Sequence, residues 1–392
     1  MAASATATLQ RTLLSVSGGI IVGTETQPTP YATLAALHGD HPLPGRHSFT
    51  ASARLGETAV GMRGDDIAVV LISGGVSSLI AAPLRGMAES DLGQLFELLL
   101  ASGLDIHDVN KIRKRFLRWG AGRLALALAP ARTFAFIMSD VPGDDPADIG
   151  SGPCTPDQTT VKEVAELLQR TGLHTKISPP MRDYLASVSR GVVPETPKRT
   201  HPAFAHVTTR VIGSNALALD AVCRHAESLD LRVERAPAPL TGEAATAGQR
   251  IADALLARAA SQSGRACMVW GGETTVQLSS RGDGARSHEQ TPGGGRCQEL
   301  ILAAARRLAQ AGDGAERITL LAAGTDGRDG TTDAAGAFAD SDVWNAIRDG
   351  GHDPDLALQR HESHAVLGAV GALLPRRNTG TNVMDVVIGL VE

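Results

Sequence analysis

Four loops rich in glycine, serine, threonine and aspartate each follow a short apolar run, and this pattern most constrains the fold. The apolar runs and the loops that follow them are 67–72 and 73–78, 133–138 and 139–145, 266–270 and 271–275, and 318–322 and 324–330. Short apolar runs are typical of buried strands in a parallel sheet. Open α/β sheets bind ligands beyond the carboxyl ends of such strands. We therefore expect an enzyme whose loops hold a polyanion and a metal ion beside acid–base groups.

The alternation of strands and helices predicts an α/β fold throughout the chain. Helical periodicity is clear at 215–227, 242–260 and 296–309, and helices of this length between strands favour a layered α/β architecture. The chain has 392 residues, which is more than usually fold around a single hydrophobic core, so we expect two domains. We place them at 1–262 and 263–392, with residues 1–16 frayed and 279–292 forming a mobile loop.

Charge and composition exclude several classes of partner. The net charge of −5 gives no support for a nucleic-acid or anionic-membrane partner. No apolar stretch approaches the length of a membrane span. The four cysteines are widely spaced without a CxxC pair, which favours reduced thiols over a disulfide framework or a zinc site. We expect a cytoplasmic protein that acts on small molecules, and its possible homo-oligomeric state stays open.

The loop at 73–78 is the first candidate phosphate site. Its sequence, Ser-Gly-Gly-Val-Ser-Ser, leaves the backbone N–H groups at Gly74 and Gly75 unhindered at the start of a predicted helix. Such a loop binds phosphate or carboxylate through its N–H groups and the helix dipole. A tight strand-to-helix turn that only needs small residues explains the same sequence equally well.

The segment at 293–296 makes a stronger case for anion binding. Gly293, Gly294 and Gly295 precede Arg296 in the first turn of a predicted helix. A cation opposes the helix dipole at that position, and a bound anion would remove the conflict. The structural alternative is an Arg296 side chain that points to solvent or pairs with Glu299.

Carboxylates follow two of the predicted strands. Asp326 and Asp329 lie in a Gly-Thr-Asp-Gly-Arg-Asp-Gly turn, where hard oxygen ligands suit Mg²⁺ or one carboxylate accepts a substrate proton. An Asx-turn loop is the alternative. Asp140 and Asp144 follow another strand together with Asp145, and so many acids at one edge require a cation or basic partners.

The most basic patch lies between these loops in sequence. It contains Asn110, Arg113, Lys114 and Arg115. Arg113 is a candidate for holding a substrate carboxylate through a bidentate fork. A solvated helix face is the alternative, and it is the favoured interpretation for Arg115.

Several familiar motifs are absent from the sequence. There is no GxGxxG string, which argues against a Rossmann dinucleotide site, and no Gly-Lys pair, which excludes a P-loop. The HExxH and GxSxG strings are missing too, so zinc protease and α/β-hydrolase interpretations have no support.

Taken together, these strings resemble the class II glycerate 2-kinases, whose C-terminal half is called the MOFRL domain. The resemblance covers about residues 16–390. The matching segments are 41–44, 71–79, 139–145, 147–153, 271–276, 293–300, 324–330 and 379–383.

The resemblance implies ATP-dependent phosphorylation of D-glycerate to 2-phosphoglycerate with Mg²⁺. It also implies a Rossmann-like three-layer N-terminal domain and a smaller α/β C-terminal domain, with the active site in the cleft between them. Phosphoryl transfer asks mainly for positioning and charge neutralisation, so we assign the candidate residues as follows. Asn110, Arg113 and Lys114 are assigned to bind the substrate carboxylate, and Arg296 to stabilise the transferring phosphoryl group. Asp140 or Asp144 is assigned to the C2 hydroxyl, and Asp326 or Asp329 to Mg²⁺. The remaining nucleotide and phosphate contacts are Ser73, Gly74, Gly75, Ser77, Ser78, Asn215, Gly272, Glu273, Thr274, Gly294 and Gly295.

The chain departs from the family pattern in three places. The usual N-terminal Gly-Lys-Ala segment is missing, a Lys-Gly-Gly string is replaced by Gly120-Ala121-Gly122, and Cys297 stands where the family usually has asparagine. Two alternatives to the kinase therefore stay open. One is a hydroxypyruvate reductase, a label that some similar proteins carry, and the other is a truncated homologue that binds ligand without turnover.

Overall fold

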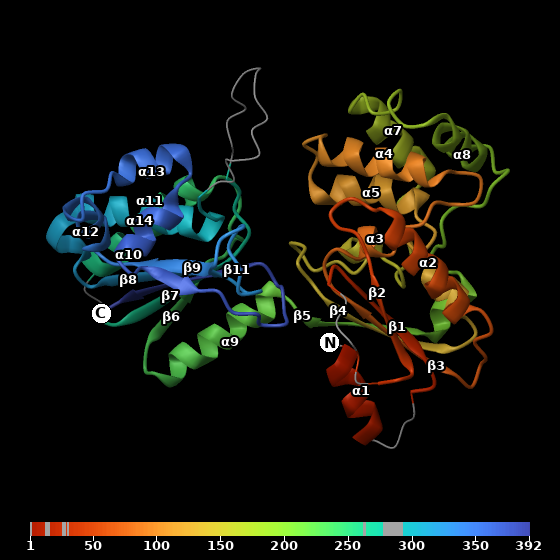
Figure 1. Ribbon diagram of the computed structural model, residues 1–392, viewed down its shortest axis with the longest axis horizontal. Helices are drawn as coiled ribbons and strands as arrows, with labels where there is room; N and C mark the ends of the chain where they lie inside the picture. Colours follow the sequence, from red (N-terminus) through yellow and green to blue (C-terminus); the bar gives the residue numbers. More distant parts are fainter. Residues whose placement is uncertain (1, 12–15, 26–28, 30, 262–263, 277–292) are drawn as a thin grey trace. The chain divides into compact units, whose positions relative to one another are not determined.

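The structure, a computed structural model, describes residues 2–11, 16–25, 29, 31–261, 264–276 and 293–392 (Figure 1). The chain forms two compact units, Met1–Ile212 and Gly213–Glu392. Each unit combines helices with strands, so the predicted α/β class and the prediction of two domains are confirmed. None of the described helices is long and apolar enough to cross a membrane.

The strands of unit 1 include two parallel pairs. β1 (Gly19–Gly23) pairs with β2 (Leu34–His38), and β3 (Ile67–Ile72) pairs with β4 (Arg132–Met138). β5 (Val207–Gly213) completes the order β3-β4-β5. Because Ile72 lies opposite Ile137, the loops that follow β3 and β4 emerge at the same edge. This is the arrangement that the apolar runs predicted.

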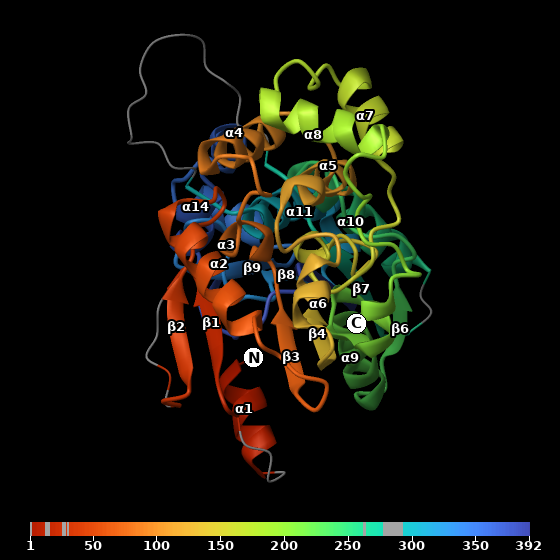
Figure 2. The same ribbon diagram turned by 90° about the vertical axis from the view of Figure 1, so that its right-hand side faces the viewer.

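Four helices of unit 1, α4, α5, α7 and α8, pack around an apolar core at one end of these strands (Figure 2). Leu92, Ile112, Phe116, Leu168 and Met181 are fully buried in it. α7 begins at a capping box formed by Thr160 and Glu163, as the sequence pattern favours. The helices are α1 (Ala2–Arg11), α2 (Arg46–Ala59), α3 (Val76–Leu79), α4 (Glu89–Leu100), α5 (Ile106–Phe116), α6 (Arg123–Leu128), α7 (Val161–Arg170) and α8 (Pro179–Ser189).

Unit 2 is built on a six-stranded mixed sheet of order β10-β9-β8-β11-β7-β6. Its strands are β6 (Arg232–Arg235), β7 (Ala266–Gly272), β8 (Ile318–Gly324), β9 (Ala334–Ala339), β10 (Leu373–Pro375) and β11 (Asp385–Val391). The expectation of a parallel sheet is wrong here, because β11 lies between β7 and β8 and runs antiparallel to both. β7 and β8 nevertheless run in the same direction, so their carboxyl ends share one edge.

Helices cover both faces of this sheet (Figure 1). α9 (Asn215–Ser228) covers one face, and α10 (Ala244–Ala260) and α11 (Arg296–Ala311) pack together on the other. A Cβ at Gly248 would lie 2.1 Å from the Leu300 carbonyl oxygen, so only glycine allows α10 and α11 to approach so closely. Three short helices complete the unit: α12 (Val343–Asp349), α13 (Pro354–Arg360) and α14 (Ser363–Ala369).

Two features differ from the sequence expectations. The units separate after Ile212, about 50 residues before the predicted boundary, because β6, α9 and α10 belong to the core built on the unit 2 sheet. Residues 2–11, expected to be frayed, form α1, in agreement with the high helix propensity of alanine. The loop predicted at 279–292 lies outside the described residues.

Candidate functional site

In unit 1, the loop after β3 lies against the loop after β4. A Cβ on Gly74 would sit 1.9 Å from Asp140 Oδ2, so the absence of a side chain at Gly74 is what lets the Asp140 carboxylate approach. Gly75 has φ of 80° and a Cβ there would lie 2.9 Å from the His41 ring, which explains glycine at that position. Burial raises the pKa of Asp140, although its own backbone N–H and His41 partly offset the effect.

A chain of buried polar side chains connects the same loop to α5. Ser77 Oγ and Ser151 Oγ lie 2.7 Å apart, and Ser151 Oγ donates to Asn110 Oδ1 at 3.3 Å. Arg113 Nη2 donates to the same amide oxygen at 2.6 Å. Both serines and Asn110 are buried. The structure thus brings Ser77 of the 73–78 loop together with Asn110 and Arg113 of α5, and it adds Ser151, which we had not selected.

Two buried donors beside this series of side chains have no hydrogen-bond partner among the described residues. Among the described residues, Asn110 Nδ2 and Arg113 Nε are buried without a hydrogen bond. Burial lowers the pKa of Arg113 to about 10, and no carboxylate within the described residues forms an ion pair with its guanidinium. Buried donors are normally satisfied in folded proteins, so this pair of donors is suited to an anionic ligand.

Lys114 has a different environment from its neighbour Arg113. Its ammonium is buried 3.2 Å from Asp157 Oδ1 and 3.8 Å from Asp148. The fully buried Arg115 binds Asp157 and Glu195, so it does not belong to a solvated helix face. Lys114 therefore has structural partners, and its role in substrate binding stays a prediction.

In unit 2, three chain segments converge at one edge of the sheet. Asp385, the first residue of β11, lies opposite both Gly272 of β7 and Gly324 of β8. The loops that begin with Glu273 and Thr325 therefore start on either side of Asp385. The carboxylate of Asp385 is buried. A polar cluster at this edge is the candidate site of unit 2.

Arg296 connects α11 to this edge. Its Nε and Nη2 bind the two carboxylate oxygens of Asp385 at 2.5 and 2.9 Å, and its Nη1 lies 2.5 Å from Glu273 Oε1. Burial lowers the pKa of Arg296, but these two carboxylates outweigh it and raise the pKa above its ordinary value. Arg296 therefore neither points freely to solvent nor pairs with Glu299. Asp385 is not among the residues predicted from the sequence, although an acid at the start of an apolar strand run is a usable signal.

Asn215 holds the segment that leads into β11. Its Nδ2 donates to the carbonyl oxygens of Val383 and Asp385, each at 2.9 Å. A Cβ on Gly271 would lie 2.0 Å from Asn215 Oδ1, so glycine is required there. Gly272 has φ of 139°, and a Cβ would meet the Leu240 carbonyl oxygen at 2.4 Å. Asn215, Gly272 and the buried Thr274 thus lie at the same edge as Asp385.

Asp329 caps the N-terminus of α11. Its carboxylate accepts hydrogen bonds from Cys297 N at 3.0 Å and from Gln298 N at 2.8 Å. A Cβ on Gly295 would lie 2.2 Å from Asp329 Cγ, and one on Gly294 would lie 2.1 Å from Ser363 Oγ. Two amides of the first turn therefore bind a protein carboxylate. Protein atoms account for the glycines at 294 and 295.

Asp326 is the carboxylate better suited to a metal ion. Its Oδ1 accepts one hydrogen bond, from Arg328 N at 2.9 Å, and the residue is half-buried at the edge described above. Mg²⁺ commonly takes one or two carboxylates and completes its octahedron with water and phosphate oxygens. The donor set of Asp326 fits that chemistry, whereas both oxygens of Asp329 already serve α11.

The predicted residues thus fall into two sets, one in each unit. Unit 1 holds the 73–78 loop, Asn110, Arg113, Lys114 and Asp140, and unit 2 holds the rest of the predicted phosphate and metal residues. Asp144 lies in the loop after β4 with φ of 54°, and its carboxylate has no hydrogen-bond or ion-pair partner within the part of the chain that the structure describes.

Comparison with known proteins identifies the family. Residues 1–186 match a domain of unknown function, DUF4147, and residues 266–385 match the MOFRL family. A D-glycerate 2-kinase of Thermotoga maritima is 34% identical over 358 residues, which cover 90% of this chain and 78% of that protein. A glycerate 2-kinase of Pyrococcus horikoshii is 32% identical over 384 residues, covering 97% of this chain and 83% of that protein.

A solved structure agrees with the sequence relatives. The crystal structure of a glycerate kinase from Thermotoga maritima matches with a TM-score of 0.85 at 31% identity, covering 100% of this chain and 88% of that one. The resemblance found in the short sequence strings therefore extends over the whole chain, which belongs to the class II glycerate kinase family.

Proposed function

We propose that the protein transfers the γ-phosphoryl group of ATP to the 2-hydroxyl of D-glycerate, giving 2-phosphoglycerate and ADP. Relatives named D-glycerate 2-kinase and glycerate 2-kinase align over at least 90% of this chain, and this agreement supports the reaction class. The polar groups of both units supply the charges that such a transfer needs.

The substrate carboxylate binds at Arg113 and Asn110. The observation that carries this assignment is a pair of buried donors, Asn110 Nδ2 and Arg113 Nε, that have no hydrogen-bond partner among the described residues. The chain Ser77–Ser151–Asn110 occupies the amide oxygen and so turns the amide NH₂ toward the ligand. A charged hydrogen bond of this kind contributes about 1.5–3 kcal/mol.

Asp140 accepts the proton of the C2 hydroxyl. Its half-buried carboxylate lies beside the glycines of the 73–78 loop, and burial raises its pKa. A general base works best when its pKa lies closer to the operating pH than that of an ordinary aspartate. Asp140 has this environment, so we prefer it to Asp144.

Arg296 stabilises the transferring phosphoryl group. Asp385 holds its guanidinium through two hydrogen bonds, so the side chain is fixed before substrate arrives. Positioned positive charge is the main resource for phosphoryl transfer. Glu273, which is exposed, gives up its contact with Arg296 more readily than the buried Asp385.

Asp326 holds Mg²⁺. When bound, the ion neutralises the charge on the β- and γ-phosphate oxygens. Within the described residues, Asp326 Oδ2 receives no hydrogen bond from a backbone amide, which suits a site in which nucleotide and water provide most ligands.

The test is an assay of the full chain with D-glycerate, ATP and Mg²⁺, in which ADP is measured directly by chromatography. Enolase added afterwards consumes 2-phosphoglycerate and not 3-phosphoglycerate, so it identifies the phosphorylated hydroxyl. We expect ADP release that depends on glycerate and a product that enolase accepts. Oxidation of NADH or NADPH by hydroxypyruvate, without ADP release, would instead establish a reductase.

Arg296→Lys tests the phosphoryl assignment. It keeps the positive charge opposite Asp385 and loses the fork, so we expect kcat to fall by about 10- to 1,000-fold, while the folded protein retains its far-ultraviolet spectrum. If kcat/KM for both ATP and glycerate stays nearly unchanged, Arg296 has no part in the transfer.

A further inference from the structure

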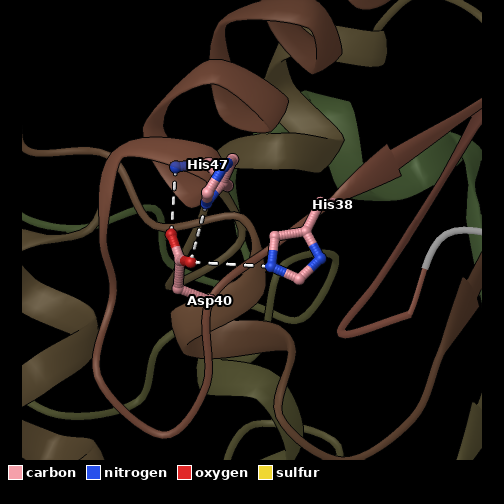
Figure 3. A group of neighbouring side chains, drawn as sticks. All are labelled: His38, Asp40 and His47. Atoms are coloured by element: carbon pink, nitrogen blue, oxygen red, sulfur yellow. Dashed lines mark hydrogen bonds and ion pairs between the residues drawn. The ribbon is translucent and has the colours of Figure 1, made fainter.

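A cluster of two histidines and an aspartate in unit 1 has no role in the proposed reaction. His38 is the last residue of β2, Asp40 follows two residues later, and His47 is in the first turn of α2. Figure 3 shows both imidazole rings directed at the same carboxylate. His47 Nδ1 lies 3.0 Å from Asp40 Oδ1, and His38 Nε2 lies 3.7 Å from the same oxygen.

We propose that His38, Asp40 and His47 form a binding site for one zinc-type divalent transition-metal ion. The three potential ligand atoms all lie within 4.8 Å of one another. Tetrahedral Zn²⁺ with bonds of about 2.0–2.1 Å separates its ligands by about 3.3 Å, and the separations of 3.0 and 3.7 Å bracket that value. Within the described residues, no other group of three or more such side chains meets this spacing.

The aspartate is oriented by the helix behind it. Asp40 Oδ2 accepts hydrogen bonds from His47 N at 2.9 Å and Ser48 N at 3.2 Å, which directs Oδ1 toward the two rings. A Cβ on Gly45 would lie 2.7 Å from Asp40 Oδ2, so glycine leaves the space that the carboxylate needs. Hydrogen bonds to the second oxygen of a ligating carboxylate fix its direction in metal sites.

Hydrogen bonding within the cluster leaves one ring unexplained. One carboxylate oxygen can accept from His47 at 3.0 Å, but His38 at 3.7 Å is beyond hydrogen-bond distance. The two rings meet edge to face with centroids 4.7 Å apart. A metal ion between the rings and Asp40 would bind one nitrogen of each ring. The hydrogen bond to Asp40 involves a nitrogen of His47 alone.

The ligand chemistry selects the metal. Two imidazole nitrogens and one carboxylate oxygen suit Zn²⁺ or Co²⁺, whereas Mg²⁺ prefers oxygen ligands. Three protein ligands leave the fourth tetrahedral position for water. His38 and His47 have exposed side chains, at 39% and 61%, so an ion reaches the site from solvent. The site is therefore distinct in chemistry from the Mg²⁺ proposed at Asp326.

The site would tie β2 to α2 across the connection that carries His41. That residue lies against Gly75 of the 73–78 loop, so a bound ion restrains one wall of that loop. An ion that binds the folded state and not the unfolded state also raises the melting temperature by mass action. This consequence can be measured without any catalytic assay.

The experiment is a titration of the full, metal-stripped chain with Zn²⁺ alone, followed by calorimetry, together with the visible absorption spectrum of the Co²⁺-loaded protein. We compare the wild type with His38→Gln, His47→Gln and Asp40→Asn, and with His352→Gln as a control. His352 is exposed and belongs to unit 2. We expect one site in the wild type and in the control, with the intense d–d bands of tetrahedral Co²⁺.

Loss of either histidine ligand should weaken Zn²⁺ binding at least about 10-fold, because even outer partners of metal ligands change affinity by that factor. The two histidine variants decide the question if Asp40→Asn perturbs the start of α2. Absence of Zn²⁺ binding in the wild type overturns the proposal. So does binding that His38→Gln and His47→Gln leave unchanged, since the ion would then lie elsewhere.

Discussion

At the scale of single residues, Arg113 has the environment of a ligand-binding group. Its Nη2 contacts the Asn110 amide oxygen, its guanidinium lies 5.2 Å from the centre of the Phe96 ring, and its Nε has no partner among the described residues. Arg113→Gln removes the charge while keeping much of the side-chain volume. We expect KM for glycerate to rise about 10- to 100-fold, from the loss of about 1.5–3 kcal/mol, with a smaller change in KM for ATP.

Arg85→Gln is the matched control, since Arg85 is an exposed arginine of the same unit. Steady-state kinetics with each substrate varied in turn separate the two constants. An Arg113→Gln enzyme with an unchanged KM for glycerate would show that the substrate carboxylate binds elsewhere.

Ser151 acts through Asn110 rather than on the substrate. Its hydroxyl bridges Ser77 and Asn110, so Ser151→Ala leaves the amide oxygen with one donor fewer and frees the amide to rotate. We expect KM for glycerate to rise by less than it does in Arg113→Gln, about 3- to 10-fold for the loss of a neutral hydrogen bond. Ser151→Thr, which keeps the hydroxyl, should recover part of the loss, and equal kinetics for the two variants would contradict the positioning role.

The sequence indicated some of these residues and not others. Asn110 and Arg113 could be predicted from the sequence because basic and amide side chains cluster within one short segment. Asp385 and Ser151 could not be predicted in this way, because their roles depend on contacts with residues that are 89 and 41 positions away in the sequence. The cluster at His38 was missed for a related reason: only the fold of the β2–α2 connection brings His47 back to Asp40.

At the scale of elements, the N-terminus of α11 depends on a side chain from another loop. Asp329 provides the hydrogen bonds that an N-cap residue normally supplies, because Gly295 occupies the N-cap position without a side chain. Asp329→Ala should reduce the free energy of unfolding by about 1–2 kcal/mol, as for loss of other caps. Chemical denaturation without nucleotide or metal measures this effect.

Asp326→Ala is the comparison for this prediction. Among the described residues, the Asp326 side chain accepts a hydrogen bond only from the nearby Arg328 amide. Its loss should therefore leave the denaturation midpoint close to that of the wild type while raising the Mg²⁺ concentration needed for activity. Equal stabilities for Asp329→Ala and the wild type would remove the capping role.

The buried charges behind α5 predict how unit 1 responds to acid. Burial raises the pKa of Asp157, but Lys114, the hydroxyls of Thr159 and Thr196, and Arg115 outweigh it and hold the pKa below its ordinary 3.8. Burial likewise raises the pKa of Glu195, and its bond from Arg115 lowers it below 4.5 overall. A depressed pKa stabilises the fold above the unfolded value, and this stability is lost as the pH falls through 4.5 and 3.8 toward the folded pKa values.

Asp157→Asn tests this network. The variant leaves Lys114 buried opposite a neutral amide, so at neutral pH we expect it to be less stable by about 3–5 kcal/mol. It should also lose less stability than the wild type between pH 5 and 3, because one titrating group is gone. Thermal melts across that range decide the matter, and parallel pH profiles for the two proteins would contradict it.

Elements with a regular pattern were predictable, and those built from small residues were not. The expected strand at 266–270 and helix at 296–309 correspond to β7 and α11, because an apolar run and a 3.6-residue period are local signals. β9, with the sequence Ala-Ala-Gly-Ala-Phe-Ala, offers neither bulk nor alternation. The antiparallel insertion of β11 was also beyond prediction, since strand direction depends on contacts with the rest of the sheet.

At the scale of the whole molecule, the two possible domain divisions make different predictions about fragments. Residues 213–392 contain β6, α9 and α10, whereas residues 263–392 lack them. Ile251 and Leu255 of α10 are almost fully buried in the same core as Leu300 and Ile301 of α11. We expect the longer fragment to unfold cooperatively on heating and the shorter one to lack a cooperative transition, because it exposes the face of α11 and leaves β7 as an open edge.

Circular dichroism of both fragments, purified under the same conditions, is the measurement. A cooperative melt of the shorter fragment at the temperature of the longer one would support a division near residue 262. Aggregation of the longer fragment alone would also contradict the prediction.

The position of β11 in its sheet affects how the protein is made. β7 and β8 are synthesised more than 60 residues before β11. In the described sheet they do not pair with each other, and each of them pairs with β11. A nascent chain on the ribosome must therefore keep two hydrophobic strands apart until residues 385–391 emerge. Because β11 completes the sheet only after the strands on both sides of it have been synthesised, we expect the incomplete chain to expose unpaired apolar strands and to be prone to aggregation.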